Sequence, residues 1–278
     1  MTVQSQTLAC QLCGRTSLQV IEQRLSSSAV YRCCFCDFAF VHPQPAVEAL
    51  KQAYESGYYE EWVTVQAKPR QRLWRRRAEE ALGGLAPGYL LDVGCGEGSF
   101  LHAAKALGWQ VTGTEISADA IRLARQQWQI EPFRGNLEEA HFPDNRFDAI
   151  TLWHVIEHVP NPEATLREVA RIARPGARII IACPNRRGLL FQAVYFLGRL
   201  RRPHLYDPSD REIHLSHFSV GSLRFLLRRC GLQVLRVDVD RGHVQAVKHW
   251  LDLSATAVNR VTGLVWSEAM EVWACKPA

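Results

Sequence analysis

The sequence predicts an α/β fold built on a largely parallel sheet, with a small metal-binding module in front of it. A short apolar run over residues 89–93 ends at a glycine, and a helical pattern of apolar residues follows, as in the strand, turn and helix of such a fold. A second apolar run over residues 147–153 suits the centre of the sheet. Two C-x-x-C pairs near the N-terminus indicate the separate module.

Length and composition fit one large domain with a small appendage. The chain has 278 residues, of which 47% are apolar, and this suffices for a sizeable core. No apolar run has the length that crosses a bilayer, and the first residues lack the basic and apolar regions of a signal peptide. Nine cysteines, an odd number, fit thiols in a reducing compartment better than a disulfide framework. We therefore expect a cytoplasmic protein, and the net charge of +5 permits nucleic acid or anionic lipid as a partner without requiring either.

Residues 1–45 are predicted to form a zinc module. The cysteines make two C-x-x-C pairs with 19 residues between them, namely Cys10 with Cys13 and Cys33 with Cys36. Four thiolates satisfy tetrahedral zinc and leave no open position, so we expect a structural ion. The polar segment between the pairs suits a small hairpin, and a module with so few apolar side chains depends on the metal to fold. Cys34 is a spare thiol that can compete with Cys33, and incidental or redox-active cysteines are the alternative.

Residues 46–88 are expected to be a linker and a helical lid. An extended His-Pro-x-Pro segment closes the cysteine module, a helix over residues 47–54 follows, and Tyr58 and Tyr59 come next in an aromatic cluster. The two tyrosines are either core residues or part of a lid that reaches the substrate.

A second helix is predicted over residues 68–85, with apolar residues at helical spacing. We assign its arginines to the outer face: Arg70, Arg72, Arg75, Arg76 and Arg77. This basic face is either solvated or a patch for RNA or lipid.

The turn after residues 89–93 is the first predicted ligand site. Its residues alternate glycine with other types: Gly94, Cys95, Gly96, Glu97 and Gly98. The following helix presents backbone amides and partial positive charge at its N-terminus. The next strand, over residues 109–114, ends in Glu115, whose carboxylate can accept both hydroxyls of a ribose.

The spacing of this turn favours one kind of ligand. It is G-x-G-x-G, whereas a dinucleotide-binding turn has G-x-G-x-x-G. Asp92 and Glu97 make an acidic lip that suits a cationic ligand and repels a pyrophosphate. A glycine-rich turn that binds nothing is the alternative.

His154, Glu157 and His158 form a second candidate site. They follow the strand over residues 147–153, whose carboxyl end faces the ligand crevice of such a sheet. On a helical turn these three positions lie on one side.

The second half of the chain supplies the remaining elements. Helices are predicted over residues 117–129, 162–173 and 220–230, the first capped by Ser117 and the last by Ser219, and strands over 131–134, 177–183, 232–239 and 269–275. Two apolar insertions lie near residues 186–206 and 244–264. The first contains an apolar stretch, 188–198, that is too short to span a membrane; it lies on a membrane, covers a lipid-like substrate or packs as an ordinary helix.

Several of these motifs resemble the class I S-adenosylmethionine-dependent methyltransferases. Residues 92–98 are similar to their motif I, (D/E)-x-G-x-G-x-G, and residues 174–176, Arg-Pro-Gly before an apolar strand, also match. Residues 154–162 closely resemble the small-molecule members near the ubiquinone-biosynthesis O-methyltransferases, and residues 214–219 resemble the entry into the family's last sheet helix. The resemblance covers residues 89–278. The cysteine module and its linker are similar to a branch that often acts on sugars, lipids or secondary metabolites.

The resemblance implies a Rossmann-like sheet of seven strands with the last strand antiparallel. It also implies that S-adenosylmethionine is bound by Asp92, Gly94, Cys95, Gly96, Gly98, Glu115, Ile116, Asn136, Leu137 and Trp153. Asn136 stands where the family usually has an aspartate near adenine, and an amide oxygen can still accept a hydrogen bond from the adenine amino group.

The resemblance further suggests a divalent metal. Some relatives hold one with Glu-x-x-Glu-His, and here His154 replaces the first Glu. We therefore consider a metal at His154, Glu157 and His158, with a hydrogen-bonded polar turn as the alternative.

The expected reaction is methyl transfer to an oxygen or nitrogen atom of a small molecule. Displacement at a sulfonium needs orientation, exclusion of water and a place for the acceptor's proton. Histidine is suited to take that proton at neutral pH. The candidate catalytic residues, in order, are His214, His158 and His154, while the resemblance implies a structural role for His217.

Three other functions are alternatives to small-molecule methyl transfer. An RNA methyltransferase would use the zinc module and the basic helix to bind phosphates, but the motif His-Val-Ile-Glu-His is not the Asn/Asp-Pro-Pro-Tyr of exocyclic amino methylation. A nicotinamide oxidoreductase would need the G-x-G-x-x-G spacing. A non-catalytic scaffold that binds zinc and a nucleotide is the third.

Overall fold

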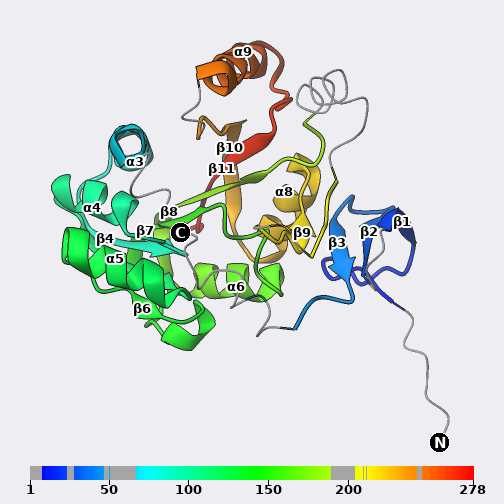
Figure 1. The fold of residues 1–278 in the computed structure, drawn as a ribbon, viewed down its shortest axis with the longest axis horizontal. Helices are drawn as coiled ribbons and strands as arrows, with labels where there is room; N and C mark the ends of the chain where they lie inside the picture. The colour runs from blue at the N-terminus through cyan, green and yellow to red at the C-terminus, as the bar shows by residue number, and fades with distance from the viewer. Residues whose placement is uncertain are drawn as a thin grey trace, which may run out of the picture.

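The computed structural model describes residues 8–23, 28–46, 50, 67–188, 204–208, 210, 212–242 and 246–278. Within them the strands form two sheets, of seven and four strands (Figure 1). None of the helices in these ranges combines the length and apolar character needed to cross a bilayer.

The larger sheet has the strand order β10-β11-β8-β7-β4-β5-β6. Its strands are β4 (Tyr89–Val93), β5 (Gln110–Glu115), β6 (Phe133–Arg134), β7 (Phe147–Trp153), β8 (Ala173–Pro184), β10 (Gln233–Val239) and β11 (Ala269–Cys275). The strands from β8 to β6 run parallel, and β11 is inserted antiparallel between β8 and β10. The predicted Rossmann-like sheet with an antiparallel last strand is confirmed.

The described part of the chain forms α-helices, some of which begin at a side-chain cap. They are α3 (Ala67–Leu82), α4 (Ser99–Ala106), α5 (Ala118–Trp128), α6 (Pro162–Ile172), α8 (Val220–Arg229) and α9 (Ala246–Thr262), with a 3₁₀ turn at Glu138–Ala140. Ser117 accepts a hydrogen bond from the backbone of Ala120, and Ser219 forms a reciprocal capping box with Ser222. Both predicted caps are confirmed.

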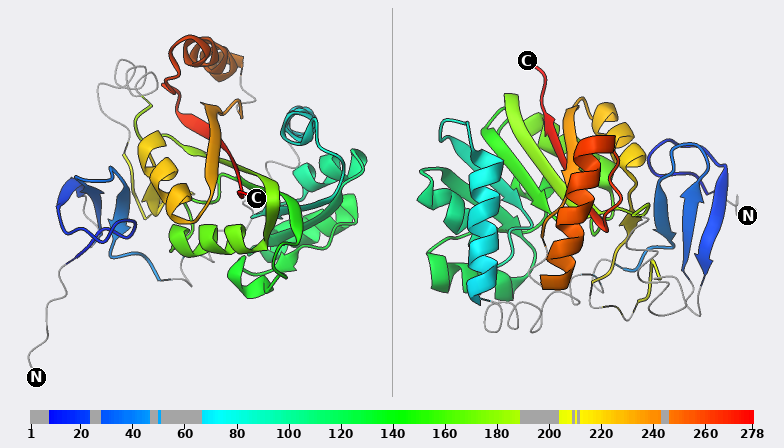
Figure 2. Two further views of the ribbon diagram at one scale, coloured as in Figure 1. Left: turned by 180° about the vertical axis from the view of Figure 1, so that it is seen from behind. Right: turned by 90° about the horizontal axis from the view of Figure 1, so that it is seen from above.

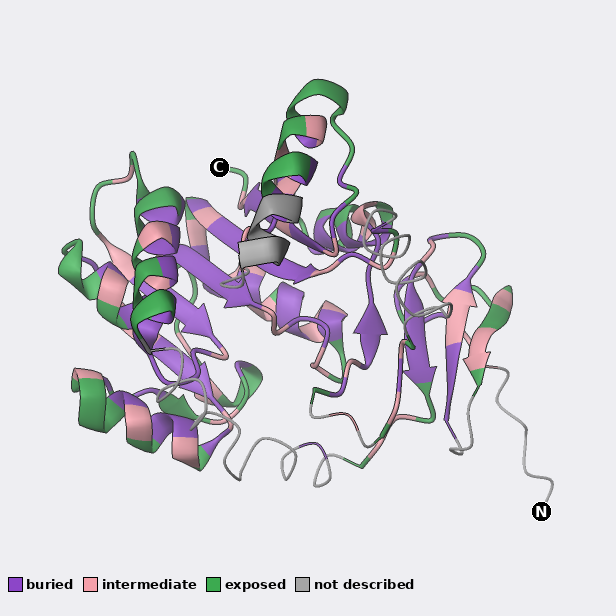
Figure 3. Ribbon diagram, turned by 45° about the horizontal axis from the view of Figure 1, so that its top comes forward, coloured by how far each residue is buried: buried purple, intermediate pink, exposed green. Residues whose placement is uncertain are grey.

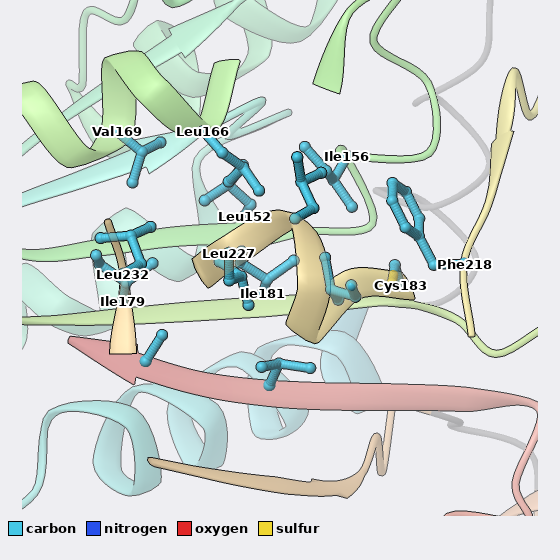
Figure 4. Packing of buried hydrophobic residues seen from close by; sticks show 14 of the residues in the cluster. Leu152, Ile156, Leu166, Val169, Ile179, Ile181, Cys183, Phe218, Leu227 and Leu232 are labelled. Atoms are coloured by element: carbon cyan, nitrogen blue, oxygen red, sulfur yellow. The ribbon is translucent and has the colours of Figure 1, made fainter. Parts of the chain in front are cut away.

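The helices cover the two faces of the large sheet. Leu91 of β4 belongs to the apolar cluster formed with α6 and α8, whereas Leu90, one residue earlier, faces α3 and α4, because successive side chains of a strand point to opposite faces. Figure 4 shows the first cluster, where Leu166 and Val169 of α6 lie on one side of the strand that carries Leu152. Figure 3 shows the strands of this sheet mainly buried, while the outer helix faces are exposed.

The smaller sheet joins the cysteine module to the rest of the chain. Its order is β1-β2-β3-β9, where β1 is Leu18–Gln23, β2 is Ala29–Cys33, β3 is Ala39–His42 and β9 is Ser216–His217. The predicted hairpin is β1 with β2. Strand β3 pairs antiparallel with β9, so a segment from the second half of the chain completes the sheet. The module lies at the opposite end of the molecule from α3, α4 and α5 in the views of Figures 1 and 2.

Helix α3 differs from the prediction in two of its arginines. Arg72 and Arg75 are exposed as expected, but Arg70 and Arg77 are buried. They lie seven residues apart and therefore on the same side of the helix as Leu73. Each is buried against a carboxylate, Arg70 against Glu97 and Arg77 against Asp240. The assignment of all five arginines to a basic outer face is therefore wrong for these two.

Two predicted features lie outside the described residues. They are the aromatic pair Tyr58 and Tyr59, with most of the preceding helix, and most of the apolar stretch 188–198. The second predicted insertion, near residues 244–264, forms α9.

Candidate active site

The glycine turn joins β4 to α4 and has a left-handed backbone at all three glycines. Their φ angles are 63° at Gly94, 55° at Gly96 and 80° at Gly98. A Cβ at Gly94 would lie 2.6 Å from a methyl carbon of Val155, so no other residue fits without a shift. The same close approach places the segment after β7 directly on the turn. The two candidate sites of the sequence are therefore neighbours.

Glu115, at the carboxyl end of β5, is tied to this turn. Its Oε2 accepts a hydrogen bond from the Gly96 amide at 2.8 Å, and its Oε1 accepts from the amides of Ile116 and Ser117, each at 2.9 Å. Burial raises the pKa of the Glu115 carboxyl, although these three amides act in the opposite direction. The carboxylate thus connects the first two strands of the site, and its predicted contact with a ribose stays a prediction.

Asp92 lies beneath the turn rather than on its lip. The side chain is buried, and its Oδ1 accepts a hydrogen bond from the Thr151 hydroxyl at 2.7 Å. Burial, together with the nearby carboxylates of Glu115 and Glu97, raises its pKa to about 8, and the hydrogen bond from Thr151 acts in the opposite direction. Asp92 and Glu97, which the sequence predicts as an acidic lip of the turn, are therefore both buried.

The other predicted cofactor residues surround the turn. Cys95 is buried, and a Cβ at Gly113 would lie 2.6 Å from its sulfur, so glycine at that position of β5 makes room for the thiol. The turn with Asn136 and Leu137 lies beside Glu115, because the Gly135 amide donates to the Glu115 carbonyl at 3.0 Å. Asn136 is exposed and Leu137 is buried.

Trp153, the last residue of β7, is packed among aromatic rings. Its ring lies 5.3 Å from that of Phe100 and 6.0 Å from that of Trp74, both edge to face. The Arg77 guanidinium lies 4.6 Å from the centre of the same ring. These contacts fix the indole against α3 and α4.

Glu157, His158 and His214 meet at the carboxyl edge of the large sheet. Their potential metal-ligating atoms lie within 4.8 Å of one another, and the rings of His158 and His214 are 4.8 Å apart. His158 Nδ1 lies 2.8 Å from the Ile213 carbonyl. The amides of Leu215 and Ser216 donate to the Glu157 carbonyl at 2.8 and 3.0 Å, which brings the second segment onto the first. Two of the three candidate catalytic histidines are thus brought together.

His154 is placed differently from the prediction. Its backbone is left-handed, with φ of 55°, and its Nε2 lies 2.9 Å from Asp240 Oδ2. Its Nδ1 lies 3.4 Å from Glu157 Oε1. His154 does not belong to the group that could hold a metal, and His214 takes its place there. Among the described residues the group that could hold a metal is therefore Glu157, His158 and His214, and not the predicted His154, Glu157 and His158, because His154 follows the strand with a left-handed backbone and contacts Asp240.

The charges at this site differ from residue to residue. Burial alone would raise the pKa of Glu157, but the imidazoles of His154, His158 and His214 outweigh it and hold that pKa below its usual range. Burial and the neighbouring His158 lower the pKa of His214 to about 4. His214 is therefore neutral at pH 7 and offers a lone pair to a proton or a metal.

Glu157 is a buried carboxylate without a hydrogen bond. Its side chain is 1% exposed, and neither carboxylate oxygen has a hydrogen-bond partner among the described residues. Such a group is costly unless a cation or a donor completes it.

The four predicted zinc ligands form one cluster. The sulfurs of Cys10, Cys13, Cys33 and Cys36 all lie within 4.8 Å of one another, with Cys10 to Cys36 and Cys13 to Cys33 each 3.5 Å apart. All are free thiols, whereas Cys34 is exposed and outside the cluster. Four sulfurs at these distances fit a tetrahedral zinc ion.

The cysteine module is connected to the loop after β8 by three residues that the sequence analysis does not single out: Asp37, Arg186 and Arg187. Asp37 follows the last cysteine and contacts Arg32 in the module and Arg186 and Arg187 in the loop after β8. Burial would raise the pKa of Asp37, but the arginines outweigh it and hold the pKa well below its usual range. The sequence signal, two adjacent arginines after a buried strand, was present, but their partner is about 150 residues away.

A family model for a methyltransferase domain matches residues 66–237. The demethylmenaquinone methyltransferase of Tropheryma whipplei (strain Twist) is 32% identical over 173 residues, which is 58% of this chain and 72% of that protein. The ubiquinone biosynthesis O-methyltransferase of Azoarcus sp. (strain BH72) is 34% identical over 147 residues, 49% of this chain and 63% of that protein.

Solved structures share the fold at lower identity. A SAM-dependent methyltransferase from Archaeoglobus fulgidus has a TM-score of 0.55 at 20% identity and covers 80% of this chain and 100% of its own. The magnesium protoporphyrin IX methyltransferase of Synechocystis, solved with bound SAH, has a TM-score of 0.55 at 16% identity and covers 82% of this chain and 98% of its own.

Proposed function

The chain belongs to the methyltransferase domain family and is an S-adenosylmethionine-dependent methyltransferase, and we propose that it methylates an oxygen or nitrogen atom of a small molecule at Glu157, His158 and His214. The observation that carries the proposal is the position of these three residues. They gather at the carboxyl edge of the sheet, where Glu157 and His158 belong to the segment that Val155 packs against the glycine turn and His214 comes from the segment before β9. A donor at the turn and an acceptor at the cluster would therefore be neighbours.

The cofactor site is built from backbone more than from side chains. The glycine turn opens α4, and Glu115 fixes the turn through the Gly96 amide. We propose that Glu115 accepts the ribose hydroxyls and that the turn at Asn136 and Leu137 contacts the adenine. S-adenosylmethionine supplies an activated methyl group on a sulfonium, so the protein needs to orient it and to exclude water.

The acceptor's proton is the remaining requirement. As the bond from the acceptor atom to the methyl carbon forms and the carbon–sulfur bond breaks, the acceptor must lose a proton. His214 is neutral and partly buried beside His158, so its imidazole offers a lone pair to the proton of a hydroxyl or an amine. The name of one relative, a ubiquinone biosynthesis O-methyltransferase, favours an oxygen atom as the acceptor.

As an alternative to proton transfer to His214, we propose that Glu157, His158 and His214 hold a divalent cation, in which case the ligating ring nitrogens no longer accept the proton. The buried carboxylate without a hydrogen bond and two imidazoles make a suitable ligand set. When bound, such a cation would polarise the acceptor oxygen and lower the pKa of its hydroxyl. In the cysteine module we propose a structural zinc ion.

Cofactor titration followed by methyl-transfer assays tests the proposal. Calorimetry should show S-adenosylmethionine binding at about one site per chain, and NAD should not compete. Labelled methyl groups should then appear on small hydroxylated or amine acceptors and not on bulk tRNA. Labelling confined to RNA would overturn the proposed acceptor, and the burial of two α3 arginines already weakens an RNA-binding face.

A matched pair of histidine variants locates the acceptor site. His214→Gln should reduce methyl transfer by about 10²-fold or more, because the proton acceptor is lost, and should leave cofactor affinity unchanged. His204→Gln is the control, because His204 precedes the same region but pairs with Asp210 instead of the cluster. Equal activity in the two variants would contradict the assignment.

A further inference from the structure

Asp240 is a buried carboxylate that the proposed reaction does not yet use. It is the first residue after β10 and is 3% exposed. Its Oδ2 lies 2.9 Å from His154 Nε2, and its Oδ1 accepts a hydrogen bond from the Arg77 guanidinium. The residue therefore links α3, the end of β7 and the end of β10.

Arg77 contacts the other carboxylate oxygen of Asp240 and holds it in place. Its guanidinium lies over the rings of Trp153, at 4.6 Å, and Trp74, at 5.0 Å, and the arginine is itself buried. A Cβ at Gly242 would lie 2.5 Å from Arg77 Nη2, so the absence of a side chain there leaves room for the guanidinium. Both partners of this ion pair are thus held by packing as well as by charge.

His154 is held in a conformation that its residue type disfavours. A φ of 55° is uncommon for a residue other than glycine. The backbone amide is fixed by a hydrogen bond to the Ala182 carbonyl at 2.9 Å. The backbone contact therefore fixes the position of the His154 Cα, and the contact with Asp240 fixes the orientation of the imidazole ring.

The ring of His154 lies between two buried carboxylates. Its side chain is 39% exposed, whereas Asp240 on one side is 3% exposed and Glu157 on the other is 1% exposed. Because the two ring nitrogens point in different directions, fixing Nε2 on Asp240 aims Nδ1 at Glu157, 3.4 Å away. The Glu157 carboxylate has no hydrogen bond among the described residues, and His158 Nε2 lies farther from the same oxygen, at 4.0 Å, so the contact with His154 is the nearer of the two that can orient it.

We propose that Asp240 is a positioning residue that holds His154 against Glu157 and so orients the carboxylate within the cluster of Glu157, His158 and His214. This rests on the proposed role of that cluster as the acceptor site. Groups that orient the ligands and bases of a site commonly affect affinity or rate by 10–100-fold without touching the substrate.

Ring signals of the histidines test this positioning directly. In nitrogen–proton correlation spectra of protein labelled with [15N]histidine, Asp240→Asn should shift the ring signals of His154, and also those of His158 and His214, which Asp240 does not touch. The control is Asp238→Asn, two residues earlier and within β10, where the carboxylate pairs with Arg236 at the surface. This control should leave all three sets of signals in place.

A second variant removes the other end of the same contact. Asparagine tolerates the left-handed conformation, so His154→Asn keeps the backbone and deletes the ring. It should shift His158 and His214 as Asp240→Asn does, and the double variant should show no larger change than either single one. Unchanged His158 and His214 signals in both single variants would overturn the proposal.

Binding and rate separate positioning from a purely structural role. Asp240→Asn should lower kcat for the acceptor by about 10–100-fold while the Kd for S-adenosylmethionine stays within about twofold, and Asp240→Glu should recover part of the rate. Equal losses in kcat and cofactor affinity would indicate a structural role and contradict the proposal. Absence of cofactor binding by the parent protein would instead reject the proposed function, while the ring signals would still report on Asp240.

Discussion

Ala39 of the cysteine module lies directly opposite His217 in an antiparallel strand pair. His217 follows His214 by three residues, and their rings are 6.3 Å apart. A strand of the module therefore fixes the segment that brings His214 to Glu157 and His158. The cysteine cluster of the module and the candidate acceptor site are connected through one sheet.

This connection predicts that zinc supports the acceptor site. The purified protein should contain about one zinc per chain, and Cys10→Ser should lose it and lower the unfolding temperature by several degrees, because a structural zinc contributes to folding. Metal analysis and thermal unfolding measure both effects. Cys34→Ser is the control, since Cys34 is exposed and outside the cluster. Normal folding and normal His214 ring signals in zinc-free protein would contradict the connection.

Asp37 is predicted to be the main polar link between the module and the loop after β8. Asp37→Ala leaves Arg186, which is mostly buried, without the carboxylate that it contacts at 2.5 Å. We expect a loss of about 2 kcal/mol in the free energy of unfolding, the size typical of hydrogen bonds to charged groups. Denaturant unfolding measures it. Asp144→Ala, which removes a mostly exposed partner of Arg171, should cost less than about 1 kcal/mol, and an equal loss in both variants would speak against a special role for Asp37.

Stability should fall with pH because of Asp92. Its pKa is raised to about 8 in the folded chain, mainly by burial, and lies near 4 in an unfolded chain. A raised carboxyl pKa contributes stability that is fully present below pH 4 and is lost as the pH rises through 8. Asp92→Asn removes this titration, so its unfolding temperature relative to the parent should increase between pH 5 and pH 8 without cofactor. Asp119→Asn, at an exposed position of α5, should show a constant difference, and the same constancy for Asp92→Asn would reject the explanation.

Glu115 is predicted to determine cofactor affinity. Glu115→Gln keeps the shape of the side chain but weakens its bonds to three amides and to any hydroxyl. Loss of one or two charge-assisted hydrogen bonds at about 1.5–3 kcal/mol each corresponds to at least tenfold weaker S-adenosylmethionine binding. Calorimetry measures the Kd. Glu131→Gln, which alters only an exposed pair with Arg125, should leave it unchanged, and an unaltered Kd in Glu115→Gln would exclude this role.

Gly94 and Gly84 separate a steric clash from backbone strain. Both have a positive φ, 63° and 75°, but a Cβ at Gly94 meets Val155 at 2.6 Å, while one at Gly84 meets nothing within 4 Å. Gly84→Ala should cost only the conformational penalty, on the order of 1 kcal/mol. Gly94→Ala should cost more and weaken cofactor binding. Adding Val155→Ala should recover part of the loss, and no recovery would show that the contact is unimportant.

Much of the fold follows from local patterns in the chain. The strand over residues 147–153 and the cap at Ser117 depend on neighbouring residues, and both occur where the sequence places them. The four cysteines also come together as predicted, since C-x-x-C spacing is a local property that a metal site exploits.

The errors concern residues whose partners are distant in sequence. Arg70 and Arg77 look like members of a solvated face until Glu97 and Asp240 are brought against them. His154 looks like a metal ligand because the spacing of a helical turn places it beside Glu157. A charged side chain becomes buried only when folding supplies its partner, and helical spacing on one segment carries no information about that partner.

The sequence by itself determined the sheet, the glycine turn and the cysteine cluster, because strand length, glycine spacing and paired cysteines act over a few residues. Only the tertiary structure decided that His214 lies beside Glu157 and His158, that His154 contacts Asp240, and that β9 pairs with β3 in the sheet of the module. Those contacts join segments that lie dozens of residues apart. The packing of the whole chain, and not the pattern within any one segment, sets which of them meet.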